Sequence, residues 1–208
     1  MLVVGVQVVE PSSLPDGAAV SGVGMRIGTL ALVMAIITAP ACGGGGSDSG
    51  IGPSPSPLLA GFVAEQPTPG LKTVSMLQAS RSNDVVSVYV FLTDIQAAYG
   101  IAFEVDFDTA GAVFLGYTRG SAFEANGGGP AYTVDGASNP GRVVVGVART
   151  SGTTTNIIGS KAVLVLQFRV KQTGEFPVTL QNGLVYDGQV PPAPMDSIQW
   201  FAGALTGV

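Results

Sequence analysis

Hydrophobic and polar positions alternate with a period of two in three segments, at residues 85–92, 100–107 and 162–171. This is the pattern of a β-strand that buries one face and exposes the other, and the β-branched content of the segments agrees with it. Each segment is therefore expected to form a strand. The positions predicted to face the core are Val86, Val88, Val90 and Leu92, then Ile101, Phe103, Val105 and Phe107, then Ala162, Leu164, Leu166, Phe168 and Val170.

Shorter apolar segments predict further strands at residues 73–79, 112–117, 143–148, 176–180 and 198–205. Clusters of Gly, Asn, Asp, Ser and Pro lie between them, as expected for turns. Many short strands with no amphipathic helix between them favour antiparallel sheets, and a domain of this size closes its core most simply as two packed sheets. The predicted fold class is all-β, an antiparallel two-sheet β-sandwich.

The N-terminal region has the pattern of an export signal. A charged start at residues 25–26 precedes an apolar run, residues 27–37, which is shorter than the about 20 residues of a membrane-spanning helix. The residues after this run are compatible with two kinds of processing: ordinary secretion with cleavage after the small residues 39–41, or lipidation of Cys42 at a site that resembles a lipobox. Lipidation is favoured because it also accounts for the single cysteine and for the Gly/Ser-rich residues 43–50.

These features divide the chain into four expected parts. They are an upstream extension, 1–24, with translation starting at Met25; a signal peptide, 25–41; the lipidated Cys42 and a Gly/Ser/Pro tether, 42–60; and one folded domain, 61–208. The expected location is the cell envelope, with a lipid anchor at the outer membrane or cell surface. Secretion is the alternative.

The composition excludes several classes of function. The chain of 208 residues has no histidine, so it lacks the commonest general base and the commonest metal ligand, and Ser-His-Asp or Cys-His catalysis is impossible. Its 9 Lys and Arg residues are scattered and its net charge is −5, which argues against a nucleic-acid partner. We therefore expect a non-enzymatic protein without a cofactor.

Several segments together resemble the cohesin family. The early strand with the following Gly-x-x-Phe strand, residues 83–92 and 99–108, is similar to the first half of a cohesin. The later half is similar at residues 143–151, 158–160, 164–170 and 174–180, so that the resemblance covers roughly residues 73–205. It implies a β-sandwich with jelly-roll topology, related to some carbohydrate-binding modules, which binds dockerin domains in polysaccharide-degrading assemblies.

The chain departs from the cohesin pattern at positions that contact dockerin in cellulosomal cohesins. The outer face of the Gly-x-x-Phe strand is polar or acidic in those proteins, whereas here Gly100 and Ala102 occupy it. Arg149 stands where an acidic residue is common. The resemblance therefore supports the fold more strongly than the partner.

Four residues are candidates for binding. Tyr89 and Phe91 are predicted to lie on the face opposite the core, where aromatic rings stack on sugars or anchor a protein partner. Glu104 and Arg149 are the charged candidates. The alternative for Tyr89 and Phe91 is that another strand or loop covers their face.

Other acidic or aromatic positions have ordinary structural interpretations. Asp106 and Asp108 could point toward a calcium ion, but Asp108 is expected instead to close the turn after its strand. Trp200 is expected in the core. The carboxylates that could suggest a glycosidase pair, but that we expect to be solvated, are Glu104, Glu124, Asp135 and Asp187.

The predicted function is a non-catalytic binding module displayed on the cell envelope. Its predicted partner is a dockerin-type protein or a polysaccharide. The alternative is a structural or assembly lipoprotein of a secretion or pilus apparatus.

Overall fold

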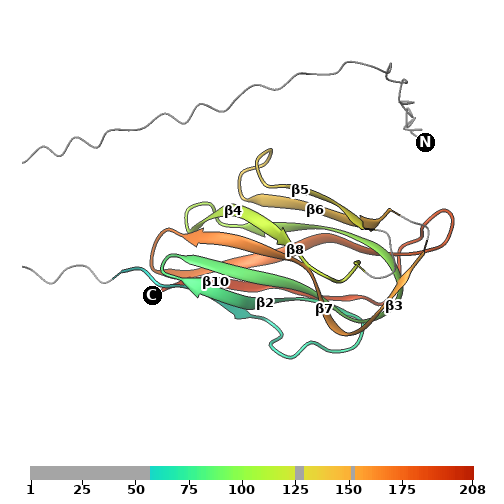
Figure 1. Cartoon of the computed structure of the whole chain (residues 1–208). Coiled ribbons are helices and arrows are strands. Elements are labelled where there is room, and N and C mark those ends of the chain that lie inside the picture. Colours follow the sequence, from blue (N-terminus) through green and yellow to red (C-terminus); the bar gives the residue numbers. More distant parts are fainter. Residues whose placement is uncertain (1–56, 125–128, 151–152) are drawn as a thin grey trace, which may run out of the picture. The chain divides into compact units, whose positions relative to one another are not determined.

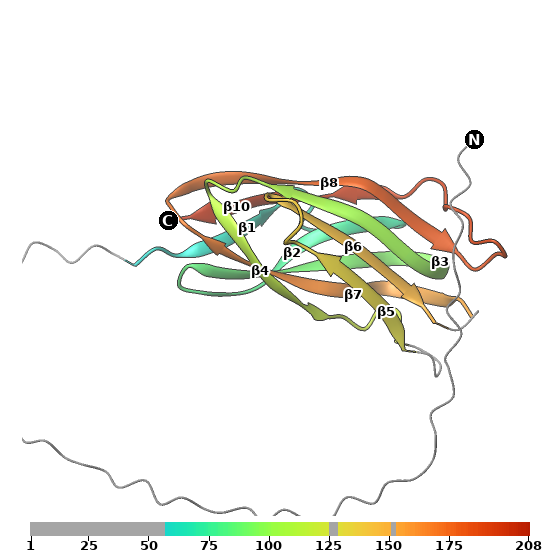
Figure 2. The same cartoon turned by 90° about the horizontal axis from the view of Figure 1, so that it is seen from above.

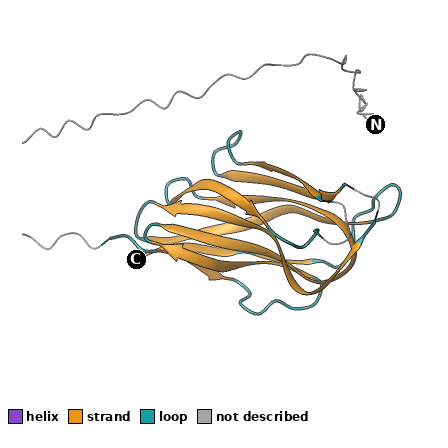
Figure 3. Ribbon diagram, viewed as in Figure 1, coloured by secondary structure: helices purple, strands orange, loops and turns teal. Residues whose placement is uncertain are grey.

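The structure, a computed structural model, describes residues 57–124, 129–150 and 153–208. The predicted lipid site at Cys42 lies outside these residues. Every regular element in the described part is a strand (Figure 3), and this part contains no helix long and apolar enough to cross a membrane. The strands are β1 Ala60–Ala64, β2 Thr73–Ser82, β3 Val85–Phe107, β4 Ala112–Arg119, β5 Pro130–Asp135, β6 Arg142–Arg149, β7 Thr155–Val170, β8 Gly174–Asp187, β9 Gln199–Phe201 and β10 Gly203–Gly207.

The long strand β3 belongs to both layers of the sandwich. Its first half, to Thr93, pairs with β2 on one side and β7 on the other. Its second half, from Gly100, pairs with β6 and β8. The first sheet therefore has the order β9-β2-β3-β7-β4, and the second has the order β1-β10-β8-β3-β6-β5. Figures 1 and 2 show the two layers from the side and from above.

The corner at which β3 passes between the sheets is fixed by its neighbour β7. Asp94 and Ala97 have φ values of 49° and 54°, a left-handed conformation that residues other than glycine rarely adopt. The Asp94 carboxylate accepts the Gly159 N–H at 2.7 Å, and the Asn156 side-chain oxygen accepts the Ala97 N–H at 2.9 Å. These bonds offset the cost of the two unusual residues.

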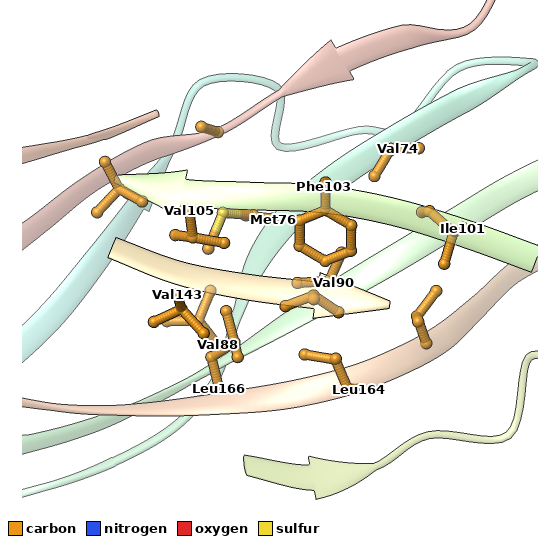
Figure 4. Packing of buried hydrophobic residues seen from close by; sticks show 14 of the residues in the cluster. Val74, Met76, Val88, Val90, Ile101, Phe103, Val105, Val143, Leu164 and Leu166 are labelled. Atoms are coloured by element: carbon orange, nitrogen blue, oxygen red, sulfur yellow. The ribbon is translucent and has the colours of Figure 1, made fainter. Parts of the chain in front are cut away.

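The core lies between the sheets and contains the positions predicted from alternation. Val86, Val88, Val90 and Leu92 are fully buried, and they face Ile101, Phe103 and Val105 from the other half of the same strand. Figure 4 shows Val88 and Val90 beside Ile101, Phe103 and Val105, with Val143 of β6 and Leu164 and Leu166 of β7. The all-β, two-sheet sandwich with jelly-roll topology is thus confirmed. Its one parallel pairing among the described strands is between β2 and β9.

The prediction for β7 is wrong at its start because of a β-bulge. Val90 pairs with Leu164, but the next residue of β3, Phe91, pairs with Ala162. Val163 is the extra residue; it is fully buried although alternation predicted it to face outward. One inserted residue exchanges the two faces, so Ala162 lies on the outer side with Phe91.

Some strands at the edges of the sheets and at the C-terminus were also predicted incompletely. Strands β1 and β5 were not predicted, and the single strand expected at residues 198–205 is two strands that belong to different sheets. The change of sheet occurs at Ala202, whose N–H donates to the Glu65 carboxylate and whose carbonyl accepts the Glu65 N–H. Trp200, just before this point, packs against the core as expected, 6.0 Å from the Phe103 ring.

Candidate functional site

The outer face of the second sheet carries a shallow apolar hollow of about 410 Å³. Its floor lies on β3, where Gly100 sits between Tyr186 and Ala148, and Ala102 sits between Leu184 and Gly146. Small residues therefore make the floor, and larger side chains stand around it. The lining includes Gly100, Ala102, Ala131, Gly146 and Ala148, with Tyr99, Tyr186 and Pro192 around them.

Gly100 has a steric reason to be glycine. A Cβ atom at this position would lie 2.9 Å from the Val147 carbonyl oxygen and 3.2 Å from the Ala148 Cβ. Strands β3 and β6 could then no longer lie at their present spacing. The absence of a side chain at Gly100 keeps the floor of the hollow flat.

One end of the same face is an ion-paired network. Arg142 lies between two carboxylates, 2.9 Å from Glu104 and 2.6 Å from Asp106. The Asn182 amide donates to Glu104 at 2.9 Å. The hydrogen bonds that Arg142 donates to the Asp106 carboxylate, and then the charges of Asp106 and Glu104, raise the pKa of Arg142 above its ordinary value. Glu104, a predicted binding residue, is therefore already engaged within its own sheet. Since one arginine faces two carboxylates, the network keeps a net negative charge.

Asp108 confirms the turn interpretation. Its carboxylate accepts the Ala110 N–H at 2.7 Å, and its carbonyl accepts the N–H groups of Gly111 and Ala112. Asp106 is held by Arg142 instead of pointing to a shared ligand. Among the residues with described positions, no three acidic or sulfur-bearing side chains gather as a metal site.

Arg149 does not lie on an exposed surface, which corrects its assignment as a binding residue. Its side chain is only 2% exposed. One terminal nitrogen donates to the Phe123 carbonyl at 3.0 Å and the other to the Thr153 hydroxyl at 3.2 Å. The cause is the alternation of β6, which turns Val143, Val145, Val147 and then Arg149 inward. Arg149 thus joins two loop segments from inside the domain.

The outer face of the first sheet carries the two predicted aromatic residues. Tyr89 and Phe91 lie on the side opposite the core and are half-buried, with ring centroids 4.8 Å apart and planes inclined by 38°. They line an open groove of about 610 Å³ together with polar residues of β4, β7 and the segment after β4. Their position is as predicted, and a role in binding stays a prediction.

The remaining carboxylates do not form a pair. Glu104 belongs to the network on the second sheet, whereas Glu124 lines the groove on the first. The Ser138 hydroxyl, and then the N–H groups of Ser138 and Ala137, donate to the Asp135 carboxylate in a turn and lower its pKa. Asp187 likewise accepts backbone N–H groups. Each of the four carboxylates is therefore held by local hydrogen bonds or ion pairs, or lies on an open surface.

Sequence reasoning missed most of the apolar hollow. Ala131 and Thr133 come from β5, which was not predicted, and Tyr186 comes from a part of β8 beyond the predicted strand. Gly146 and Ala148 could have been found, because they are the outward positions of the predicted strand at residues 143–148.

The described part of the chain is an all-β domain with an apolar hollow on one outer face and a groove lined by aromatic and polar residues on the other. The sequence model of the cohesin domain matches residues 73–191, more than half of the chain. The chain therefore belongs to the cohesin family, whose domains are non-catalytic protein-binding modules.

Solved cohesins have the same fold. A type II cohesin domain from the cellulosome of Acetivibrio cellulolyticus is 11% identical, with a TM-score of 0.51, and the match covers 70% of this chain and 92% of the other. The second type II cohesin module of the adaptor ScaA scaffoldin of Acetivibrio cellulolyticus is 8% identical, with a TM-score of 0.50 and coverage of 73% and 89%. At these identities the likeness shows the fold alone. A comparison with curated proteins found no match.

Proposed function

We propose that this protein is an envelope-displayed cohesin that binds a dockerin-like protein through the outer face of β8, β3, β6 and β5. The observation that carries the proposal is the apolar hollow over Gly100 and Ala102. Within the part of the chain that the structure describes, no strand or loop fills it. Family membership supports a protein as the occupant.

The shape and chemistry of this face suit an apolar partner surface. Small residues on the floor let the backbone of a partner approach closely, and Tyr99 and Tyr186 provide rigid rings at its border. Gly100 and Ala102 replace the polar groups expected in a cellulosomal cohesin. The affinity should therefore come from apolar burial, about 25 cal/mol per Å² removed from water, while Glu104 and Arg142 at one end restrict orientation.

Display on the envelope completes the proposal. Lipidation at Cys42 would attach the chain to a membrane, and the tether that ends at residue 60 would then separate the domain from the surface. A structural role in a secretion or pilus apparatus is the alternative, and it would use the same face to contact a different protein. A polysaccharide suits the hollow poorly, because the hollow has few hydrogen-bonding groups.

The test is binding of the purified full chain to a panel of dockerin modules by calorimetry. Ala102→Arg places a charge in the centre of the hollow and should weaken binding by at least about tenfold. Ser87→Arg is the matched control, because Ser87 lies on the outer face of the other sheet. Failure to bind any dockerin, or equal losses in both variants, would contradict the proposed site.

A further inference from the structure

The groove on the outer face of the first sheet is not used by the proposed function. Its floor is made by Tyr89 and Phe91, whose rings lie side by side with centroids 4.8 Å apart. Both side chains belong to the first half of β3, whereas the apolar hollow lies on the second half. Since the two halves belong to different sheets, the groove and the hollow are on opposite outer faces of the sandwich.

The strand beside the aromatic pair leaves it accessible. Val165 pairs with Tyr89, and Ala162 pairs with Phe91 because the bulge brings Ala162 to the outer face. Regular alternation would instead have placed Val163, a larger residue, next to Phe91. The bulge therefore puts the smaller side chain where it opens the groove beside the ring.

The wall of the groove is held firmly against β7. The Gly120 N–H donates to the Val163 carbonyl at 2.9 Å, and the Ala122 N–H donates to the Ala162 carbonyl at 2.8 Å. A Cβ atom at Gly120 would lie only 2.1 Å from the Ala162 carbonyl oxygen. The chain after β4 can follow β7 this closely because residue 120 is glycine, and the wall is consequently well defined.

Hydrogen-bonding groups surround the aromatic floor. The charged members are Arg119, Lys161 and Glu124, and the hydroxyl members are Ser121 and Ser160. Arg119 lies over the Tyr132 ring, 5.1 Å from its centroid, which fixes its position next to the groove. The lining thus combines cations, a carboxylate and hydroxyls with exposed ring surface. The hollow on the opposite face is lined by small apolar residues.

We propose that this groove binds a neutral polysaccharide. A pyranose ring has a C–H face that stacks on an aromatic side chain and a rim of hydroxyls that donate and accept hydrogen bonds, and the groove offers both kinds of contact. A neutral chain fits best because cations and a carboxylate share the rim, so neither sign of charge on the ligand is favoured throughout. The groove is open to solvent instead of enclosed, which suits a polymer. This inference goes beyond the proposed function and does not depend on it, since the two sites lie on opposite faces.

The experiment is a calorimetric titration of the purified full chain with two neutral sugars, xylohexaose and cellohexaose. Oligogalacturonate, an acidic sugar chain, is titrated for comparison. The chain is expected to bind at least one neutral oligosaccharide. The double variant Tyr89→Ala/Phe91→Ala should weaken this binding by about tenfold or more, since it removes both ring surfaces on which a sugar would stack. Tyr186→Ala removes an aromatic side chain from the opposite face and should leave sugar binding unchanged.

Thermal melting of each variant separates a lost site from a lost fold. If the double variant is unfolded, Ala162→Gln provides the test, because it fills the groove while both rings remain. Binding of neutral sugars that is lost in the folded groove variant and kept in Tyr186→Ala supports the proposal. The proposal is overturned if the parent chain binds neither neutral oligosaccharide, or if it binds oligogalacturonate alone. It is also overturned if a folded groove variant loses dockerin binding but keeps sugar binding. Because dockerin binding is tested by Ala102→Arg, failure of one site is distinguishable from failure of the other.

Discussion

Replacing Arg149 should destabilise the domain without acting directly on a binding surface. The side chain is among the largest that are fully buried, and it donates to the Phe123 carbonyl and the Thr153 hydroxyl. Arg149→Met keeps much of the apolar volume but removes both donors. Arg149→Ala removes the volume as well and leaves a cavity.

The expected change in the free energy of unfolding combines two losses with one gain that partly offsets them. Two hydrogen bonds from a charged donor are worth about 1.5–3 kcal/mol each, and the buried Phe123 carbonyl loses its partner. Against this, the variant no longer has to bury a guanidinium group, which costs several kcal/mol. We expect the free energy of unfolding to fall by about 1–2 kcal/mol in Arg149→Met and, with the cavity, by about 3–4 kcal/mol in Arg149→Ala.

Equilibrium unfolding in urea, followed by fluorescence of the single tryptophan, measures these values. Trp200 is a suitable probe because it packs against the core near Phe103. Arg81→Met is the matched control, since Arg81 is an exposed arginine of β2, and its stability should change by less than about 0.5 kcal/mol. If Arg149→Met and Arg149→Ala unfold at the same urea midpoint as the parent chain, the interpretation that buried Arg149 stabilises the domain is refuted. A folded Arg149→Met chain of normal stability that has lost dockerin binding would refute it too.

Three further predictions concern separate features. Gly183→Ala should lower the free energy of unfolding by about 1–3 kcal/mol, because the added Cβ would lie 2.5 Å from the Trp200 ring. Gly146→Ala is the control and should be tolerated, because the nearest atom to its added Cβ is 3.9 Å away. Urea unfolding of the two variants tests the difference. The lowered pKa of Asp135 means that its contribution to stability is present above the unfolded-state pKa and is lost as the pH falls through the folded-state value. NMR titration should place that value below the ordinary one, and acid should destabilise Asp135→Ala less than the parent chain. Cys42→Ser should move the chain from the membrane fraction to the soluble or secreted fraction and abolish incorporation of labelled fatty acid, and a membrane-bound Cys42→Ser chain would contradict lipid anchoring.

The parts of the fold that depend on local alternation were predictable. The inward positions of β3 require only a period of two, and Val86 to Leu92 and Ile101 to Val105 are buried accordingly. The bulge at Val163 was not predictable, because nothing in the apolar segment itself marks the extra residue. Strand β1 was missed because it forms only by pairing with β10, which is distant in sequence.

The candidate sites were predictable to different degrees for the same reason. Tyr89 and Phe91 were found from the alternation of one strand. Their polar neighbours in the groove depend on how β4 and β7 are placed beside that strand, which a single segment does not reveal. Arg149 shows the opposite error: its place in the cohesin pattern suggested a surface, although the period of β6 pointed inward, and here the periodicity was the better guide.

The pairing of β1 with β10 has a mechanical consequence for an anchored protein. The register of five residue pairs, from Ala60 with Gly207 to Ala64 with Gly203, is extended by reciprocal bonds between Leu59 and Val208. Figures 1 and 2 show the start of β1 and the C-terminus at the same end of the domain. If the chain is anchored at Cys42 as proposed, a pull on a partner bound to a sheet face loads the domain through β1. Tension along that strand shears it lengthwise against β10, so these hydrogen bonds must break together, and their joint rupture limits the force that the module transmits.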